Sequence, residues 1–253
     1  MAAVTQRLID PGEGTPEAEW LPWLDATSIQ AIAAEALVPE GSRAVVVAPH
    51  PDDEVLAVGG LLSCLAALGR ELRIIAVTDG TASHPGSSRW PPDVLERIRP
   101  AETRRALALL GVPHDLLRLG LPDGGLKALR PLLADALIPL LLPGDVVFTT
   151  WSADGHPDHE ATGQATALAA TCSGATVIEV PVWGWHWAKP GDRRMPWRRA
   201  RRVLLDGDAS ARKRSALQAF ESQMQPDPST GSGPVLRNST LARAARPFEV
   251  VFA

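Results

Sequence analysis

Short apolar runs alternate with longer helical segments along most of the chain. The runs are rich in β-branched residues and are bounded by Gly, Pro or Asp, as is typical of strands buried on both faces of a sheet. Strands are predicted at residues 43–48, 72–78, 116–119, 146–149, 176–180 and 248–252. Because strands alternate with helices, the pattern predicts an α/β fold with a doubly wound, mostly parallel sheet and helices on both faces.

Helical spacing of apolar positions fills most of the gaps between these strands. Two of the segments end at a glycine, Gly69 and Gly111, which is the preferred residue just beyond a helix. Helices are predicted at residues 26–37, 54–68, 93–110, 126–142, 160–171 and 209–222. The alternation lapses at residues 183–202, where Trp and Arg are dense, and a loop rich in Pro, Gly and Ser follows at 225–234.

A chain of 253 residues with 45% hydrophobic content can bury the core of one α/β domain. We therefore expect a single domain over residues 1–253. Within it, residues 1–42 form an N-terminal extension, and residues 183–234 form a variable region that binds or covers the substrate.

Charge and cysteine usage narrow the class of protein. A net charge of −4 lacks the strongly basic character of a domain that binds nucleic acid. Cys64 and Cys172 lie in Ala- and Leu-rich helical surroundings without CxxC spacing, which predicts reduced, buried thiols. The first twenty residues carry no apolar signal region, and no apolar run is long enough to cross a bilayer. We expect a cytoplasmic protein without a transmembrane segment or a nucleic-acid partner.

Two short polar motifs are near copies of each other. Residues 50–54 are His-Pro-Asp-Asp-Glu, residues 156–160 are His-Pro-Asp-His-Glu, and each motif closely follows a predicted strand. Proline is favoured at the first position of a helix and acidic side chains in its first turn, so each motif predicts a strand-to-helix junction. Since the carboxyl ends of parallel strands form the binding edge of such a sheet, both junctions are expected to face one crevice.

The residue types in the two motifs suit a catalytic metal. Zinc in catalytic sites takes three protein ligands from His and acidic side chains and leaves one position for water, whose pKa falls to about 7. His50, Asp53 and His159 would fill that set. The alternative is helix capping alone, but two such motifs at sheet edges favour the metal site.

The remaining residues of the motifs are candidates for the chemistry itself. A carboxylate beside the activated water is a natural general base, and Asp52 fits that role. His156 would act as a general acid or stabilise the oxyanion, with Asp158 as the residue that orients it.

At these motifs the chain resembles the LmbE-like/PIG-L family of metal-dependent N-deacetylases. The family carries Ala-His-Pro-Asp-Asp-Glu after the first strand and His-Pro-Asp-His later, and here Pro49 replaces the usual alanine. The resemblance implies a Rossmann-like fold, a zinc ion or another divalent metal, and hydrolysis of an N-acetyl amide, commonly on glucosamine-type sugars. It also implies the ligand set and the catalytic roles given above.

Other segments extend the resemblance and supply candidate substrate contacts. Asp79 and His84 lie in what looks like the second-strand loop of the family, Arg99 in a helix motif whose arginine contacts substrate, and Asp123 in another active-site turn. The alternatives are ordinary ones: the acidic residues could close turns before glycine, and Arg99 could be solvated.

The Trp- and Arg-rich segment has two interpretations. If it is extended, Trp183, Trp185 and Trp187 face one way and could stack on a sugar, so Trp185 and His186 are further candidate substrate contacts. Packing in the core or at a subunit interface is the alternative, and a homo-oligomer is possible. The arginines between 193 and 202 could bind an anionic substrate or form a solvated face.

Three functions are compatible with these residues. The first is a zinc-dependent hydrolase that removes an N-acetyl group from a small, sugar-linked substrate. The second is a non-heme Fe(II) enzyme, because two histidines and one carboxylate also describe that site. The third is a non-catalytic ligand-binding relative.

Overall fold

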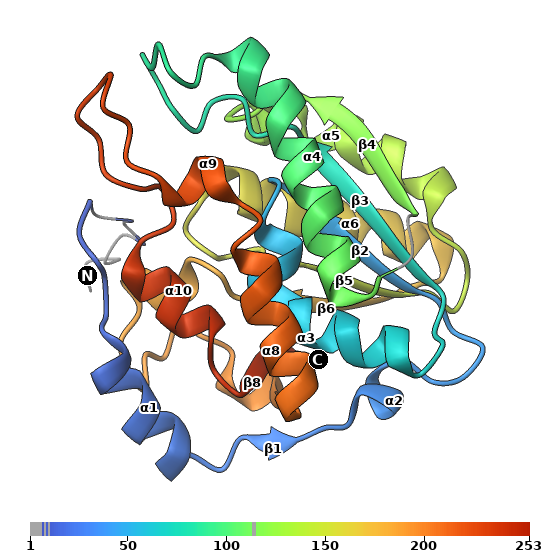
Figure 1. The fold of residues 1–253 in the computed structure, drawn as a ribbon. Coiled ribbons are helices and arrows are strands. Elements are labelled where there is room, and N and C mark those ends of the chain that lie inside the picture. The colour runs from blue at the N-terminus through green and yellow to red at the C-terminus, as the bar shows by residue number, and fades with distance from the viewer. Residues whose placement is uncertain (1–6, 8, 10, 113–114) are drawn as a thin grey trace, which may run out of the picture.

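The protein, seen here in a computed structural model that describes residues 7, 9, 11–112 and 115–253, is built around one twisted sheet (Figure 1). Within the described residues the sheet has eight strands in the order β1-β7-β8-β6-β5-β2-β3-β4. The strands are β1 Gln30–Ala31, β2 Ala44–Ala48, β3 Leu72–Thr78, β4 Leu116–Leu121, β5 Val146–Thr150, β6 Thr176–Val180, β7 Ala200–Leu204 and β8 Phe248–Phe252. The run from β6 to β4 is parallel, whereas β8 pairs antiparallel with both β6 and β7. The predicted mostly parallel α/β sheet is confirmed.

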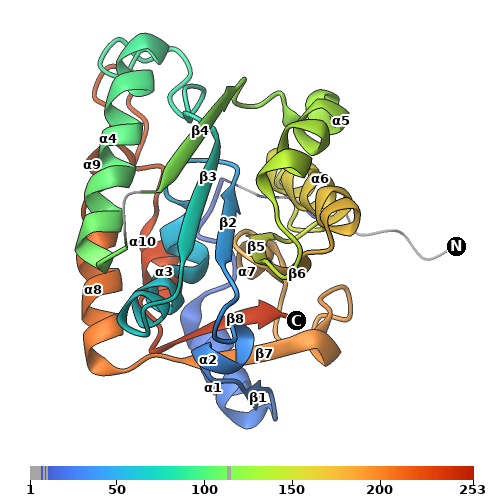
Figure 2. The ribbon, with the colours of Figure 1, turned by 90° about the vertical axis from the view of Figure 1, so that its right-hand side faces the viewer.

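Helices cover both faces of this sheet. Figure 2 shows α3, α4 and α8 on one side of the central strands and α5 and α6 on the other. The helices are α1 Glu17–Ala26, α2 Ala34–Leu37, α3 Asp53–Ala67, α4 Pro92–Leu110, α5 Leu126–Leu137, α6 Pro157–Ser173, α7 Gly184–Trp187, α8 Gly207–Leu217, α9 Glu221–Met224 and α10 Asn238–Ala244. Successive residues of a strand point to opposite faces of the sheet and so pack in two separate cores. Val46 packs in the cluster with α3, and Val45 and Val47 pack in the cluster with α5 and α6.

The segment before β2 differs from the prediction. Residues 26–37 were expected to form one helix, but α1 ends at Ala26 and only the four residues of α2 are helical. Between them, β1 pairs with β7, and the Ile32 N–H donates to the Arg202 carbonyl. Pairing with a distant strand therefore overrides the local helical pattern.

A break in α3 shapes the start of this helix. Val58 has φ −137° and ψ 21°, so the helical ladder is interrupted there. Lys213 Nζ donates to the Leu56 carbonyl at 3.1 Å and pairs with Glu249 at 2.6 Å, and Glu249 accepts the N–H groups of Gly60 and Leu61. This buried pair thus satisfies the backbone groups freed by the break and fixes the first turns of α3, which reach the functional site.

Both cysteines are free thiols, as predicted, but neither is fully buried, since Cys64 is half-buried and Cys172 on α6 is exposed. Within the described residues, no helix is both long and apolar enough to cross a membrane.

Candidate active site

The two His-Pro-Asp motifs meet at one edge of the sheet. They follow β2 and β5, which are parallel neighbours, so their carboxyl ends lie side by side. The imidazole of His156 lies 5.1 Å from that of His50 and 5.0 Å from that of His159, centroid to centroid. The predicted crevice between the junctions therefore exists.

The two junctions differ in detail. His156 caps α6 with Pro157 at the first helical position, as predicted. At the first junction, however, α3 begins only at Asp53, and Asp52 before it has φ 124°, a region that favours glycine. The strained backbone turns the Asp52 carboxylate into the crevice, where strain is often retained for function.

His50, Asp53 and His159 converge. Asp53 Oδ2 lies 3.1 Å from His50 Nδ1 and 3.3 Å from His159 Nε2, and one ligand atom from each of the three residues lies within 4.8 Å of the others. The buried His159 Nε2 makes no hydrogen bond, so its lone pair is available. Two imidazole nitrogens and one carboxylate oxygen beside a cavity fit a catalytic zinc ion with an open fourth position.

A second set of possible ligands shares His50. His50 Nε2 lies 3.2 Å from Asp123 Oδ1 and 3.5 Å from Asp158 Oδ2. Asp158 is already engaged, because its two oxygens accept the backbone N–H groups of Gly124 and Leu126 at the start of α5. The set with Asp53 therefore suits a metal better.

This geometry corrects the role expected of Asp158. Its carboxylate was predicted to orient the His156 ring, but it holds the turn before α5 instead. The His156 ring is oriented by the backbone, since the Asp158 N–H donates to His156 Nδ1 at 3.3 Å.

Asp154 is a buried site residue that the sequence did not single out. Its Oδ2 accepts from His159 Nδ1 at 2.8 Å, so Nε2 of that ring is left to face the ligand cluster. Burial lowers the pKa of His159, but the charges of Asp53 and Asp154 outweigh burial and raise it to about 9. Asp154 could have been found in the sequence as a carboxylate that lies just before the His-Pro-Asp-His motif.

Arg99 holds Asp52 in place. The buried guanidinium donates to the carbonyls of Pro51 and Gly80 at 2.5 and 2.8 Å and to Asp52 Oδ2 at 3.1 Å. Burial raises the pKa of Asp52 to about 7, although the charge of Arg99 opposes the rise. Arg99 lines the cavity, but its contacts are those of a residue that positions Asp52.

Asp123 also borders the cavity. Its Oδ2 accepts the Ala82 N–H at 2.7 Å, and its Oδ1 faces His50. Burial raises the pKa of Asp123, but the hydrogen bond from His50 outweighs burial and lowers it to about 2. The carboxylate is therefore ionised and able to accept a hydrogen bond from a ligand.

Two predicted substrate contacts lie outside the cavity. Asp79 forms a two-point ion pair with Arg118 at 2.7 and 2.8 Å, so its carboxylate is already neutralised. His84 is buried, its Nδ1 lies 2.9 Å from Ser83 Oγ, and its ring lies against Trp90. Both residues support the loop that carries Ser83 to the cavity.

The Trp-rich segment is helical rather than extended, which corrects the predicted wall of three indoles. Because α7 is helical, its side chains point in different directions. Of the three tryptophans, Trp183 lines the cavity, and its ring is stacked on that of His156 with 6.1 Å between the centroids. Trp185 packs edge-on against Trp20 in the core, and the buried His186 accepts the Thr15 N–H through its carbonyl. Trp185 and His186 are therefore structural.

The arginines between 193 and 202 do not reach the cavity. Arg194 pairs with Asp192 and Arg199 with Glu179, and part of the segment forms β7. Strand pairing with β8 explains why this polar segment is ordered.

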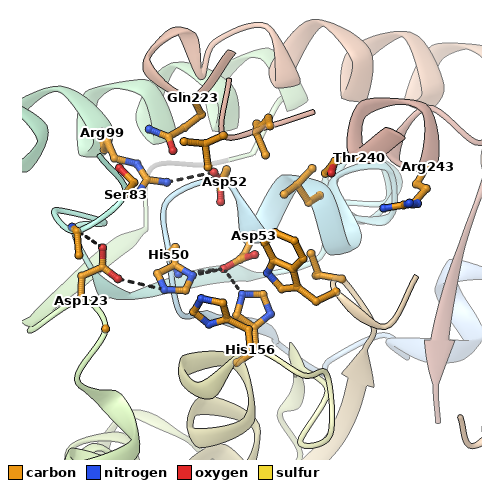
Figure 3. Close-up of a pocket in the computed structure, with 18 residues that line it drawn as sticks. His50, Asp52, Asp53, Ser83, Arg99, Asp123, His156, Gln223, Thr240 and Arg243 are labelled. Carbon is orange, nitrogen blue, oxygen red and sulfur yellow. Dashed lines mark hydrogen bonds and ion pairs between the residues drawn. The ribbon is translucent and has the colours of Figure 1, made fainter. Parts of the chain in front are cut away.

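The cavity has a volume of about 260 Å³ (Figure 3). One side carries the residues of the two motifs, and the other is built from the last quarter of the chain. The sequence pointed to no cavity residue there but predicted that residues 183–234 bind or cover the substrate. The residues from that quarter are Gln223, Val235, Leu236, Thr240 and Arg243. They come from α9, α10 and the loop between them, where the sequence shows no strong motif.

Comparison with known proteins agrees with this architecture. Residues 45–170 match the family described as PIG-L, GlcNAc-PI de-N-acetylase. The chain is 27% identical to a 1D-myo-inositol 2-acetamido-2-deoxy-alpha-D-glucopyranoside deacetylase of Corynebacterium diphtheriae, over 73% of this chain and 77% of that protein. It is 31% identical to a probable N-acetyl-alpha-D-glucosaminyl L-malate deacetylase 2 of Bacillus anthracis, over 49% of this chain and 58% of that protein.

A solved structure shows the same fold. The zinc-inhibited form of teicoplanin deacetylase Orf2 superposes with a TM-score of 0.57 at 24% identity, over 73% of this chain and 85% of that chain. The matched family region contains both His-Pro-Asp motifs and the converging His and Asp side chains. The chain belongs to the PIG-L (LmbE-like) family.

Proposed function

We propose that this protein is a zinc-dependent N-deacetylase that hydrolyses the acetamide of an amino-sugar-like substrate. The observation that carries the proposal is the convergence of His50, Asp53 and His159 beside Asp52 and His156 in one cavity. The two relatives above support it, since both are named as deacetylases of glucosamine derivatives.

The three ligands are expected to hold a divalent cation, which would supply an acidified water and polarise the amide carbonyl. Asp52, with a pKa of about 7, is suited to accept a proton from the attacking water near neutral pH and to return it to the leaving nitrogen. A C–O bond forms, the amide C–N bond breaks, and the products are acetate and a free amine.

His156 is suited to the carbonyl oxygen. Burial lowers its pKa to about 3, together with the charges of His159 and His50, so the ring is neutral. Because Nδ1 accepts the Asp158 N–H, the proton of the neutral ring lies on Nε2. His156 would thus stabilise the developing oxyanion as a hydrogen-bond donor. We further propose that Asp123 accepts a hydrogen bond from the sugar.

The same donor set also describes Fe(II) oxygenases, and a binding protein could keep it without turnover. A base with a pKa near 7 and a neutral imidazole beside the ligands favour hydrolysis, because neither group is needed to hold metal.

The test is direct. The zinc-loaded protein is incubated anaerobically with N-acetylated amino sugars, both free and as glycosides, and newly formed primary amine is measured. Wild type should release amine, and Asp52→Asn should bind zinc without release. Asp79→Asn, outside the cavity, is the control that should retain turnover. Absence of amine from every sugar, or undiminished release by Asp52→Asn, would overturn the proposal.

We also propose that residues 1–253 act as one domain. β1 of the extension 1–42 pairs with β7, and Glu17 binds Arg246 through two hydrogen bonds at 2.6 and 2.8 Å. Trp183 and Gln223, from the variable region 183–234, line the cavity and support its role in substrate binding.

A further inference from the structure

Arg243 is a cavity arginine without a carboxylate partner. It is 8% exposed and lines the cavity, and its Nη2 donates to the backbone carbonyls of Glu13 and Thr15 at 2.8 Å each. Its Nε is buried without a hydrogen-bond partner, and no carboxylate of the described residues lies within ion-pair distance. Two other buried arginines, Arg99 and Arg246, differ from Arg243 because each forms an ion pair: Arg99 with Asp52, and Arg246 with Glu17.

A buried cation without a counter-ion is unfavourable. Burial and the charge of Arg246 lower the pKa of Arg243 to about 10, although the charges of Glu17 and Glu13, both beyond ion-pair distance, oppose the fall. The guanidinium is therefore charged at neutral pH. The two carbonyls satisfy part of its donor capacity but do not neutralise the charge. An anion that enters the cavity would do so.

The position of Arg243 gives the cavity two chemically distinct ends. Thr240 lies three residues earlier on α10 and shares its face. Figure 3 shows Thr240 and Arg243 across the cavity from Asp123 and His50. The carboxylates that line the cavity lie at the metal-ligand end, whereas the end at α10 carries the guanidinium and the threonine hydroxyl.

We propose that Arg243, with Thr240 beside it, forms a subsite for an anionic group, a carboxylate or a phosphate, carried by the substrate away from its acetamide. The subsite rests on the proposed function, because it names the substrate class of the same cavity. Arginine suits both anions, since its planar fork matches their paired oxygens. The substrate is then an N-acetylated amino sugar with an acidic substituent.

The first experiment compares three substrates of the zinc-loaded enzyme: the methyl glycoside of N-acetylglucosamine, the same glycoside with a carboxymethyl aglycone, and a third with a phosphoethyl aglycone. A hydrogen bond to a charged group contributes about 1.5–3 kcal/mol, which corresponds to roughly 10–150-fold. Wild type should prefer an acidic glycoside over the neutral one by about that factor in kcat/KM, mainly through KM. Arg243→Gln should lose the preference and retain turnover of the neutral glycoside.

Arg246→Gln is the matched control. Both arginines tie α10 and its C-terminal end to residues 13–17, so either variant loosens that contact, but Arg246 is already neutralised by Glu17. Arg246→Gln should keep the preference for the acidic glycosides. Equal loss of preference in both variants would mean that Arg243 is only a structural tie, and would overturn the subsite.

Calorimetric binding of the same glycosides to the metal-free protein separates the two proposals. Tighter binding of an acidic glycoside to wild type, and not to Arg243→Gln, supports the subsite even if no glycoside is hydrolysed, in which case the proposed function fails alone. Hydrolysis of all three glycosides with equal kcat/KM and equal binding overturns the subsite and leaves the deacetylase standing. The wild-type comparison decides the matter even if Arg243→Gln does not fold.

Discussion

Replacement of Asp154 by asparagine should weaken metal binding although Asp154 is not a ligand. The side chain is fully buried, and each of its oxygens accepts two hydrogen bonds. Oδ2 accepts from His159 Nδ1 at 2.8 Å and from the Trp183 N–H at 2.9 Å, and Oδ1 accepts from the Val182 and Gly184 N–H groups at 3.0 and 2.8 Å. Asp154 therefore links the orientation of His159, a proposed metal ligand, to the backbone that carries Trp183.

The size of the effect follows from these four bonds. Asparagine keeps one oxygen and replaces the other with NH₂, so in either orientation two N–H donors face another donor. Hydrogen bonds to a charged group contribute about 1.5–3 kcal/mol each, so the variant should lose about 3 kcal/mol or more of unfolding free energy. Loss of such a carboxylate–histidine contact typically weakens metal binding by about 10–100-fold.

The assay is competitive zinc titration against a chelating dye, with urea unfolding of the metal-free protein in parallel. Asp145→Asn is the control, because Asp145 is also buried and lies at the other end of β5, where it binds Arg43 at 2.6 and 3.1 Å. It should lose similar stability with unchanged zinc affinity. If Asp154→Asn binds zinc within twofold of wild type, the claim that Asp154 orients His159 is wrong.

Four further predictions test the site and its support. Asp52→Asn should keep zinc affinity within a few fold and lower kcat by about 10²–10⁴-fold, as for loss of a general base; metal analysis and amine release check both values, and an unchanged kcat would exclude the role. Zinc affinity should rise from pH 6 to about pH 9, because His159, with its pKa raised to about 9, must lose its proton to bind metal; calorimetry at several pH values would show a flat profile if this is wrong. The protonated ring also stabilises the metal-free fold fully below pH 6.5, and this contribution should be lost as pH rises through 9. Lys213→Met should lower the unfolding free energy by about 3–5 kcal/mol, because Glu249 stays buried without its cation; a loss below 1 kcal/mol in urea unfolding would contradict the support assigned to the break in α3.

The strands and the convergence of His50, Asp53 and His159 could be predicted because their signals are local. β3 and β8 have the predicted boundaries, because short β-branched runs that are bounded by polar residues or proline define where a strand begins and ends. The two His-Pro-Asp motifs follow the ends of β2 and β5 within a few residues, so the general rule for parallel sheets places them together without further information.

Features set by distant contacts could not be predicted in this way. β1 forms only because β7 offers it an edge, and α7 is helical because the Asp154 carboxylate collects three successive N–H groups at its start. Asp79 has the same local pattern as Asp123, a carboxylate before glycine at a strand end. Arg118, on the adjacent strand β4, neutralises Asp79, whereas His50 faces Asp123.

Two parts of the chain line the cavity, and we expect one of them to carry out the chemistry and the other to select the substrate. The matched family region, 45–170, contains all the proposed metal ligands as well as Asp52 and His156. The wall with Gln223, Thr240 and Arg243 comes from residues 221–243. This wall reaches the cavity because β8 returns antiparallel between β6 and β7, which brings the segment before it across the open end of the sheet. Within the described residues, the side-chain hydrogen bonds of Gln223 and Arg243 go to Ser222, Glu13 and Thr15 and to none of the three proposed ligands. We therefore expect that changes there alter which substrate is accepted while the arrangement of His50, Asp53 and His159 is kept.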